Sequence, residues 1–264
     1  MSMAVFASRR VWVARCGVRF VSSRARRSAA RTRSSRSRLG GGGMAGILRG
    51  EAGWADAVAD ALRAAGRPIR SAPGFLPRAD TGTSIRRYER SSLPPPRPAS
   101  TLLALYPADG ELTIPLTVRH GALRSHAGEV SLPGGAADSA DQTRADTALR
   151  EAHEEIGLDP AIVRVLGTLD DIWIPVSNFE LRPFVAAVSE RPTLIAHDAE
   201  VAAIVELPLR LLLGDEIVRE EEIQLPDLLL RAHVYRHAGV RIWGATARTL
   251  AMLATVLVGA GLGE

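Results

Sequence analysis

Three glutamates recur at helical spacing in the segment TALREAHEEIGL, residues 147–158. Glu151, Glu154 and Glu155 lie three and four residues apart, which makes them neighbours on one face of an α-helix. Like charges placed in this way repel by about 0.2–0.5 kcal/mol per pair. The residues alone leave two interpretations open: a solvated acidic helix face, or carboxylates gathered to share a hard divalent cation.

The surroundings of the three glutamates favour the cation site. A Pro-Gly-Gly turn at 133–135 precedes the expected helix, and glycine lets a ligand approach the backbone closely. Ala148 and Ala152 leave space beside the carboxylates. Arg150 precedes Glu154 by four residues and is expected to hold it in place. Mg²⁺ takes oxygen ligands, often one or two carboxylates plus substrate phosphates, and a metal held this way polarises phosphoryl oxygens and activates water.

The elements that must position this cluster can be predicted from periodicity and turn residues. A helix is expected at about 143–156, with Gly157 as its left-handed C-terminal residue. Upstream, two apolar runs near 101–106 and 111–119 predict strands, and Asp109-Gly110 between them is a strong hairpin signal. The cluster is therefore expected to follow a β-hairpin and a glycine turn.

The remaining pattern predicts an α/β fold. An amphipathic helix is expected at 51–65, and strands or strand-like segments at the positions given next. These are 161–169, 181–188, 199–213 (a strand that runs into a short helix) and 233–244. The last segment, 245–261, is an apolar helix interrupted by Arg248. It is shorter than the roughly 20 apolar residues of a membrane span, so we interpret it as a core helix. Strands and helices interleave without a strict repeat, which indicates a mixed sheet between helical layers.

The charge of the chain is concentrated at its beginning. All 33 basic residues are arginine, and residues 1–43 hold 11 of them with no acid. The other 22 basic residues face 29 acidic ones, so the rest of the chain has a net charge near −7. The sequence pI of 10.1 thus describes the leader, and we do not interpret the core as a nucleic-acid binder. The single cysteine, Cys16, excludes an internal disulfide framework and a cysteine-based zinc site.

Three interpretations of the Arg/Ser-rich residues 1–43 are open. Their composition is that of an organellar transit peptide, or of a disordered basic arm that meets nucleic acid or anionic membrane. Alternatively, the native chain starts at Met44, just after a glycine run. We expect three parts: this leader, an N-terminal helix with a Pro-rich extended segment at 44–95, and a catalytic domain at 96–264. The expected location is cytoplasmic, of bacterial type, or organellar if the leader is a genuine transit peptide.

The glutamate segment resembles the Nudix box, whose core is Arg-Glu-apolar-x-Glu-Glu-x-Gly-apolar. The matching residues are Arg150, Glu151, Ala152, Glu154, Glu155, Gly157 and Leu158. One departure is visible: the box has a glutamate eight residues before the arginine, where this chain has Gln142. Asp141 lies one residue earlier, and Gly135 is also one residue further from Arg150 than usual.

That offset resembles the coenzyme A pyrophosphatase branch of the Nudix superfamily, and so does the upstream segment LTVRHGALRSHAGEVSLPGG. The residues that match that branch are Leu116, Thr117, Arg119, Arg124, Gly128, Pro133, Gly134 and Gly135. Leu132 stands where phenylalanine is usual. The resemblance covers roughly residues 95–255 and implies the Nudix-type α/β/α sandwich with a mixed β-sheet.

The resemblance also implies roles for the acidic residues. Glu151 and Glu155 are expected metal ligands, and Glu154 is either a third ligand or a catalytic residue positioned by Arg150. Glu200 matches a glutamate that Nudix enzymes often supply from a downstream loop as ligand or general base. Alternatively, Glu200 is an ordinary exposed acid in a loop, with no part in metal binding or catalysis.

The expected substrate contacts lie before the helix. Arg119, Arg124 and His126 form a cationic group suited to phosphate oxygens, with ordinary surface arginines as the alternative. Gly134 and Gly135 are expected to shape the loop near the metal and the diphosphate.

The implied reaction is hydrolysis of a diphosphate with Mg²⁺ or Mn²⁺. Coenzyme A or a derivative would give 3′,5′-ADP and 4′-phosphopantetheine. Alternatives are a Nudix diphosphatase for NADH, ADP-ribose or nucleotide sugars, a non-catalytic Nudix-fold binding module, and a nucleic-acid protein acting through its leader. The expected partner is a small molecule, with no nucleic acid for the core, no membrane span, and a homodimer as an open option.

Overall fold

A computed structural model gives the structure of the protein. The described residues are 47–79, 90, 93–120, 129–197, 199–225 and 228–262. Within these ranges, every helix is too short or too polar to span a bilayer.

In the described residues, the main sheet has eight strands and is built around strand β2, Arg97–Ala108. The strand β2 pairs antiparallel with β3 and β5 but parallel with β8, which makes the sheet mixed, as predicted. Strand β3 also pairs with β4 and β9, and β8 with β6 and β7. Their bounds are β3 Glu111–Arg119, β4 Val130–Ser131, β5 Gly134–Ala136, β6 Arg164–Thr168, β7 Ile172–Ile174, β8 Phe179–Ala187 and β9 Val201–Pro208.

The predicted hairpin joins β2 to β3. Asp109 and Gly110 have φ angles of 51° and 81°, and Ala108 pairs directly with Glu111. Two central residues with positive φ form the turn whose twist matches that of paired strands. The sequence prediction of a turn at Asp109-Gly110 is confirmed.

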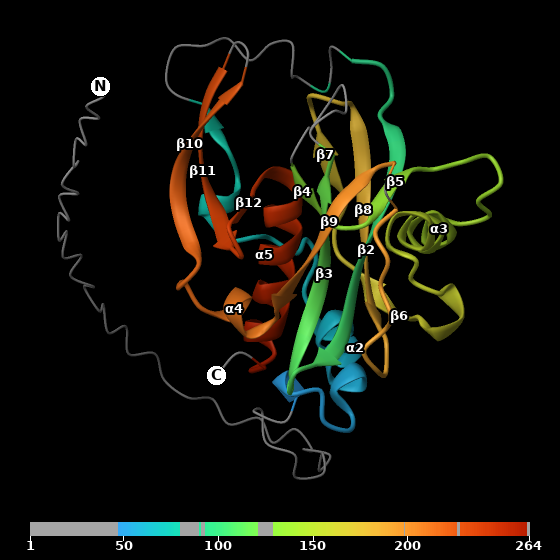
Figure 1. Ribbon diagram of the computed structural model, residues 1–264. Helices are drawn as coiled ribbons and strands as arrows, with labels where there is room; N and C mark the ends of the chain where they lie inside the picture. Colours follow the sequence, from blue (N-terminus) through green and yellow to red (C-terminus); the bar gives the residue numbers. More distant parts are fainter. Residues whose placement is uncertain are drawn as a thin grey trace, which may run out of the picture. The chain divides into compact units, whose positions relative to one another are not determined.

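Helices cover both faces of the main sheet (Figure 1). One face of β2, with Leu102, Ala104 and Tyr106, packs in a cluster with residues of α3, Arg144–Ile156. The other face packs in the main core with residues of α2, Trp54–Ala64, and α5, Gly244–Gly259. Burial on both faces explains why β2 reads as a continuous apolar run. The three layers form an α/β/α sandwich, as predicted.

A second sheet of four strands packs beside α5. Its strands are β1 Arg78–Ala79, β10 Val218–Leu225, β11 Leu228–His237 and β12 Val240–Ile242. Tyr235 of β11 is buried and stacks on Phe75 of the short helix η1, Pro73–Phe75, with 4.7 Å between ring centroids. Two short helices complete the described elements, η4 Pro160–Ile162 and α4 Arg210–Leu213.

Helix α3 has well-defined ends. Thr143 caps its N-terminus: the hydroxyl accepts from the Asp146 N–H, and the Asp146 carboxylate accepts from the Thr143 N–H at 2.8 Å. Such reciprocal caps satisfy two backbone donors at a helix start. Gly157 ends the helix with φ 66°, the left-handed conformation that was predicted for it. These two caps define where α3 begins and ends, and thus which face of the helix carries the glutamates.

Candidate active site

The glycine turn before α3 is shaped by close contacts that exclude a side chain. Gly134 has φ 155°, and a Cβ on it would lie 2.3 Å from the Ser100 carbonyl oxygen. A Cβ on Gly135 would lie 2.5 Å from Oε2 of Glu151. Glycine at both positions therefore lets β5 run between β2 and the carboxylates of α3.

Glu155 is a buried carboxyl group, with 4% of the residue exposed. Its Oε2 accepts from the Gly134 N–H at 3.2 Å, and its Oε1 lies 3.9 Å from Nη1 of Arg119. Burial raises the pKa of Glu155 to about 7, and the charges of Glu151 and Glu200 add to the rise. The Gly134 N–H and Arg119 oppose this shift without cancelling it.

Glu151, one helical turn earlier, is also affected by burial and by neighbouring charges. Burial raises its pKa, the neighbouring Arg150 lowers it, and the charges of Glu154 and Glu200 raise it further. Glu200 is exposed and lies immediately before β9. Its backbone carbonyl oxygen accepts from the His120 N–H at 3.1 Å. Its charge acts on both Glu151 and Glu155, so the structure places it in the same electrostatic neighbourhood.

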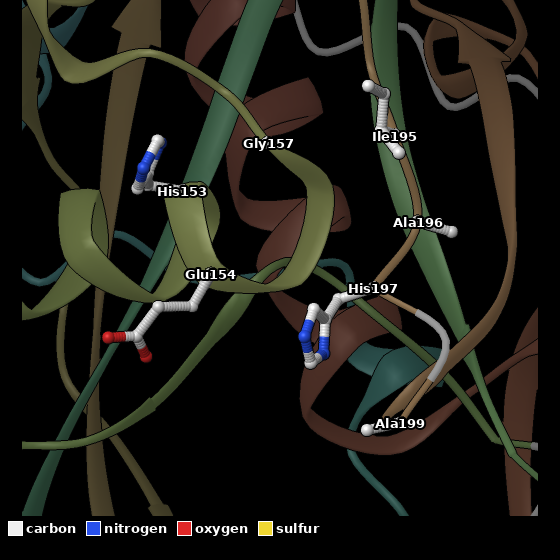
Figure 2. A pocket seen from close by; sticks show the side chains of 7 residues that line it. All are labelled: His153, Glu154, Gly157, Ile195, Ala196, His197 and Ala199. Atoms are coloured by element: carbon white, nitrogen blue, oxygen red, sulfur yellow. The ribbon is translucent and has the colours of Figure 1, made fainter.

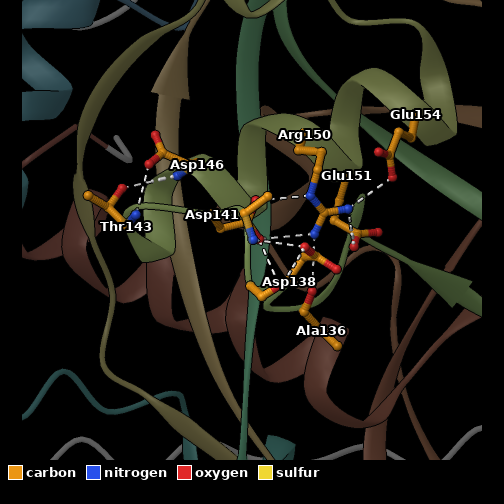
Figure 3. Close-up of polar contacts among 10 residues, drawn as sticks. Ala136, Asp138, Asp141, Thr143, Asp146, Arg150, Glu151 and Glu154 are labelled. Atoms are coloured by element: carbon orange, nitrogen blue, oxygen red, sulfur yellow. Dashed lines mark hydrogen bonds and ion pairs between the residues drawn. The ribbon is translucent and has the colours of Figure 1, made fainter.

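Arg150 joins the acidic residues to the preceding loop (Figure 3). Its Nε and Nη2 donate to the two carboxylate oxygens of Asp141 at 3.0 and 3.1 Å. Its Nη1 contacts Glu151 at 2.9 Å and Glu154 at 3.0 Å, and Nη2 also donates to the Ala136 carbonyl at 3.1 Å. The predicted Arg150–Glu154 pair is confirmed.

Asp141 is the residue whose part in the site was not foreseen. Its side chain is 6% exposed, and the hydrogen bonds from Arg150 hold its pKa well below the usual range. In turn, these bonds raise the pKa of Arg150. The sequence did contain a signal: Asp141 lies one residue before the position where the Nudix box has glutamate. The fork of Arg150 pairs with this offset acid.

Glu154 is more exposed than the other two glutamates: 56% of its side chain is accessible to solvent. It lines a pocket of about 440 Å³ with His153, Gly157 and His197 (Figure 2). Arg119, Gly134 and Gly135 do not line that pocket. The contact with Arg150 is observed, and the two roles expected for Glu154 stay predictions.

The donor set fits a hard divalent cation. Glu151 and Glu155 are oxygen donors one helical turn apart, and their mutual repulsion in a buried place is what a dication would relieve. With side chains as they stand, no three acidic, histidine or cysteine residues in the described ranges form a metal-binding group. Two carboxylates with open positions are the arrangement typical of Mg²⁺ sites completed by water and substrate phosphates.

A cavity of about 1200 Å³ opens beside the acids. Arg119, Gly134 and Gly135 line it, and much of the remaining wall is apolar, from β7, β8 and the start of α5. Arg119 enters the cavity wall where the pairing of β3 with β9 shifts register, and such a bulge re-aims a side chain. Arg124 and His126, also predicted to bind substrate, lie outside the described residues.

Comparisons with known proteins agree with this picture. The model of the NUDIX domain matches residues 95–227. Two proteins of Arabidopsis thaliana are similar: "Nudix hydrolase 22, chloroplastic", 38% identical over 61% of this chain and 56% of the relative, and "Nudix hydrolase 15, mitochondrial", 36% identical over 61% and 59%. The matched part of this chain thus spans less than two thirds of the length of these plant relatives. An "Uncharacterized Nudix hydrolase NudL" from Pectobacterium atrosepticum is 35% identical over 54% of this chain and 73% of the relative.

The raised pKa of Glu155 predicts a pH-dependent cost to the metal-free fold. The carboxyl group titrates near 4.5 ordinarily and at about 7 in the folded chain. The folded state therefore binds the proton more tightly, and its stability falls as pH rises from about 4.5 to about 7. At one pKa unit per 1.36 kcal/mol, the cost above pH 7 is about 3 kcal/mol. In urea unfolding with EDTA, we expect Glu155→Gln to be more stable than wild type at pH 8 and equal to it near pH 4.5.

Glu220→Gln is the matched control, because Glu220 is exposed on β10. It is expected to change the free energy of unfolding by little at either pH. Equal stability of Glu155→Gln and wild type at pH 8 would show that the buried carboxyl group carries no such cost.

Proposed function

Because the chain belongs to the Nudix hydrolase family, we propose that it hydrolyses the diphosphate of a nucleoside diphosphate-linked substrate with the aid of a divalent metal. The observation that carries this proposal is the burial of the Glu155 carboxyl group beside Glu151, which raises the pKa of Glu155 and costs stability even though Arg119 lies 3.9 Å away. A binding module without catalysis would gain nothing from this cost. The glycine turn at 134–135 places the pair next to a large cavity.

In the proposed site, Glu151 and Glu155 would hold Mg²⁺ or Mn²⁺. Such an ion, when bound, polarises phosphoryl oxygens and lowers the pKa of a coordinated water. Arg150 keeps Glu151 and Glu154 in place through its contacts with both, and Asp141 fixes the guanidinium from the other side. We therefore propose that three residues are positioning residues, which hold one another and Glu151 in place: Arg150, Asp141 and Glu154.

We propose that Arg119 binds the substrate and that Glu200 accepts the proton of the attacking water. Arg119 lies against Glu155 and in the cavity wall, so its guanidinium can bind phosphate oxygens that reach the acids. A carboxylate oxygen of Glu200 is our candidate to accept the proton of the attacking water, because its charge already acts on Glu151 and Glu155. The exposed position of Glu200 leaves it free to move to that water.

Coenzyme A or a derivative is the substrate that we propose, with 3′,5′-ADP and 4′-phosphopantetheine as products. Support comes from the residues that resemble the coenzyme A pyrophosphatase branch, among them Arg119 and the Pro-Gly-Gly turn. The cavity of about 1200 Å³ with largely apolar walls suits a long ligand that carries a nucleoside and an aliphatic arm. NADH, ADP-ribose and nucleotide sugars are the alternative substrates.

The location of the protein is a separate proposal. The names of the two plant relatives contain the words chloroplastic and mitochondrial, and the arginine-rich, acid-free composition of residues 1–43 supports an organellar leader. A cytoplasmic protein whose translation starts at Met44 is the alternative.

A panel of diphosphates tests the choice of substrate. With Mg²⁺ or Mn²⁺, we expect a higher kcat/KM for coenzyme A than for NADH, ADP-ribose or UDP-glucose, because a largely apolar cavity wall would favour the pantetheine arm. Product release measured by chromatography gives the comparison. Equal or faster turnover of NADH would overturn the choice of coenzyme A and leave the diphosphatase assignment intact.

Substitution of the buried carboxylates tests the catalytic proposal itself. We expect Glu155→Gln to reduce kcat by at least about 100-fold on every substrate in the panel, since loss of a metal ligand removes several kcal/mol of transition-state stabilisation. Melting temperatures check that the variant is folded, and Glu220→Gln serves again as the control of equal charge change. Unchanged hydrolysis by Glu155→Gln would contradict the catalytic role of α3.

A further inference from the structure

Two arginines line the large cavity from different layers of the fold. Arg119 belongs to β3 in the main sheet, and Arg248 belongs to α5. The Nε atom of each is buried without a hydrogen-bond partner. Arg119 at least lies 3.9 Å from Glu155, whereas no ion pair joins Arg248 to any acid in the part of the chain that the structure describes.

The isolation of Arg248 is unusual among the partly buried arginines of this protein. Arg182 forms two hydrogen bonds with Asp171 at 2.8 and 2.7 Å, and Arg144 donates to Ser100 and to backbone carbonyls. Burial lowers the pKa of the Arg248 guanidinium, and no neighbouring charge opposes that effect. Burial of a charged guanidinium without a paired acid is unfavourable. The position of Arg248 in the cavity wall therefore favours the binding of an anionic group of a ligand there.

The first turn of α5 adds to the positive character of this part of the wall. Gly244, Ala245 and Thr246 line the same cavity, and the N-cap residue, Trp243, supplies no side-chain acceptor to the turn. The first backbone N–H groups of a helix have no partner within the helix and carry the positive end of its dipole. Residues four apart lie on one face of a helix, so Arg248 shares a face of α5 with Gly244, and both line the cavity.

We propose that Arg248 and the first turn of α5 form a second anionic subsite, which binds a phosphomonoester of the substrate apart from the diphosphate that is cleaved. A phosphomonoester offers three oxygens and nearly two charges, which match a guanidinium fork and helix N–H groups better than a single carboxylate does. This inference rests on the proposed function only in taking the substrate to be a nucleoside diphosphate derivative. It selects, within that class, substrates with an additional phosphate, as coenzyme A has and dephospho-coenzyme A lacks.

The test is a binding experiment without metal and without turnover. Calorimetric titrations of the full chain with 3′,5′-ADP, 2′,5′-ADP and AMP compare ligands that differ only in the additional phosphate. We expect wild type to bind one of the two bisphosphates at least about tenfold more tightly than AMP. Arg248→Gln should remove that preference while the affinity for AMP stays within about twofold, and Arg248→Lys should keep part of it because the charge remains.

Arg210→Gln is the matched control, since Arg210 on α4 pairs with Glu111 at the surface. It should leave the preference unchanged. The melting temperature separates a ligand site from a structural role: within the described residues no ion pair holds Arg248, so Arg248→Gln should be at least as stable as wild type.

Three results of the binding experiment would overturn the inference. They are equal binding of AMP and both bisphosphates by wild type, an equal loss for all three ligands in Arg248→Gln, or a preference that survives in that variant. Failure of the proposed hydrolysis would be seen separately, as bisphosphate preference without turnover of any diphosphate. Turnover of coenzyme A and dephospho-coenzyme A at equal kcat/KM by wild type would conversely leave the hydrolase assignment standing and contradict the subsite.

Discussion

Two carboxylates held one helical turn apart in a poorly solvated place constrain the rest of this site. Glu155 is almost fully buried, and Glu151 fills the space where a side chain on Gly135 would lie. Burial raises the pKa of both carboxyl groups, and the charge of Glu151 adds to the rise at Glu155. The glycine turn, the capped helix and the bulge that aims Arg119 are the features that keep these two groups together. Arg150 pairs with Glu151, whereas Arg119 stays 3.9 Å from Glu155, and the repulsion that remains at Glu155 is what a bound dication would relieve.

The arginine at the start of the cluster resolves how three glutamates on one face can differ in role. Arg150 binds Glu154 at the exposed end and Asp141 at the buried end, and it also contacts Glu151. Glu155 is the one of the three that Arg150 does not contact in the structure; its partners are Gly134 and the more distant Arg119. Sequence spacing alone makes the three acids equivalent, and the contacts of one guanidinium distinguish them.

Much of the fold could be predicted, because long periodic segments carry their own signals. The helix ending at Gly157 and the turn at Asp109-Gly110 depend on local backbone conformations that few residues adopt. Strand β10 was missed, since its run of Glu220 to Glu222 reads as solvated loop although it pairs with β11 along its whole length. Three strands are only two or three residues long, so they show no periodic pattern and are defined by pairing with longer strands: β4, β5 and β7.

The site was predictable only as far as the motif reached. The glutamates, Arg150 and the glycine turn could be named, whereas the pairing of Asp141 with Arg150 required the path of the loop. Arg248 is only an interruption of an apolar helix in the sequence, and it becomes a candidate for binding once α5 is seen to line the cavity. Burial and the absence of a partner are properties of the packed chain.

Proton release on metal binding tests the central claim most directly. Manganese titrations at pH 6.5, followed by calorimetry in buffers of different ionisation enthalpy, count the protons displaced per ion. With the pKa of Glu155 at about 7, binding at Glu155 should release more than about half a proton per ion. The release should disappear in Glu155→Gln. Absence of manganese binding, or binding with the same proton count in that variant, would contradict the account.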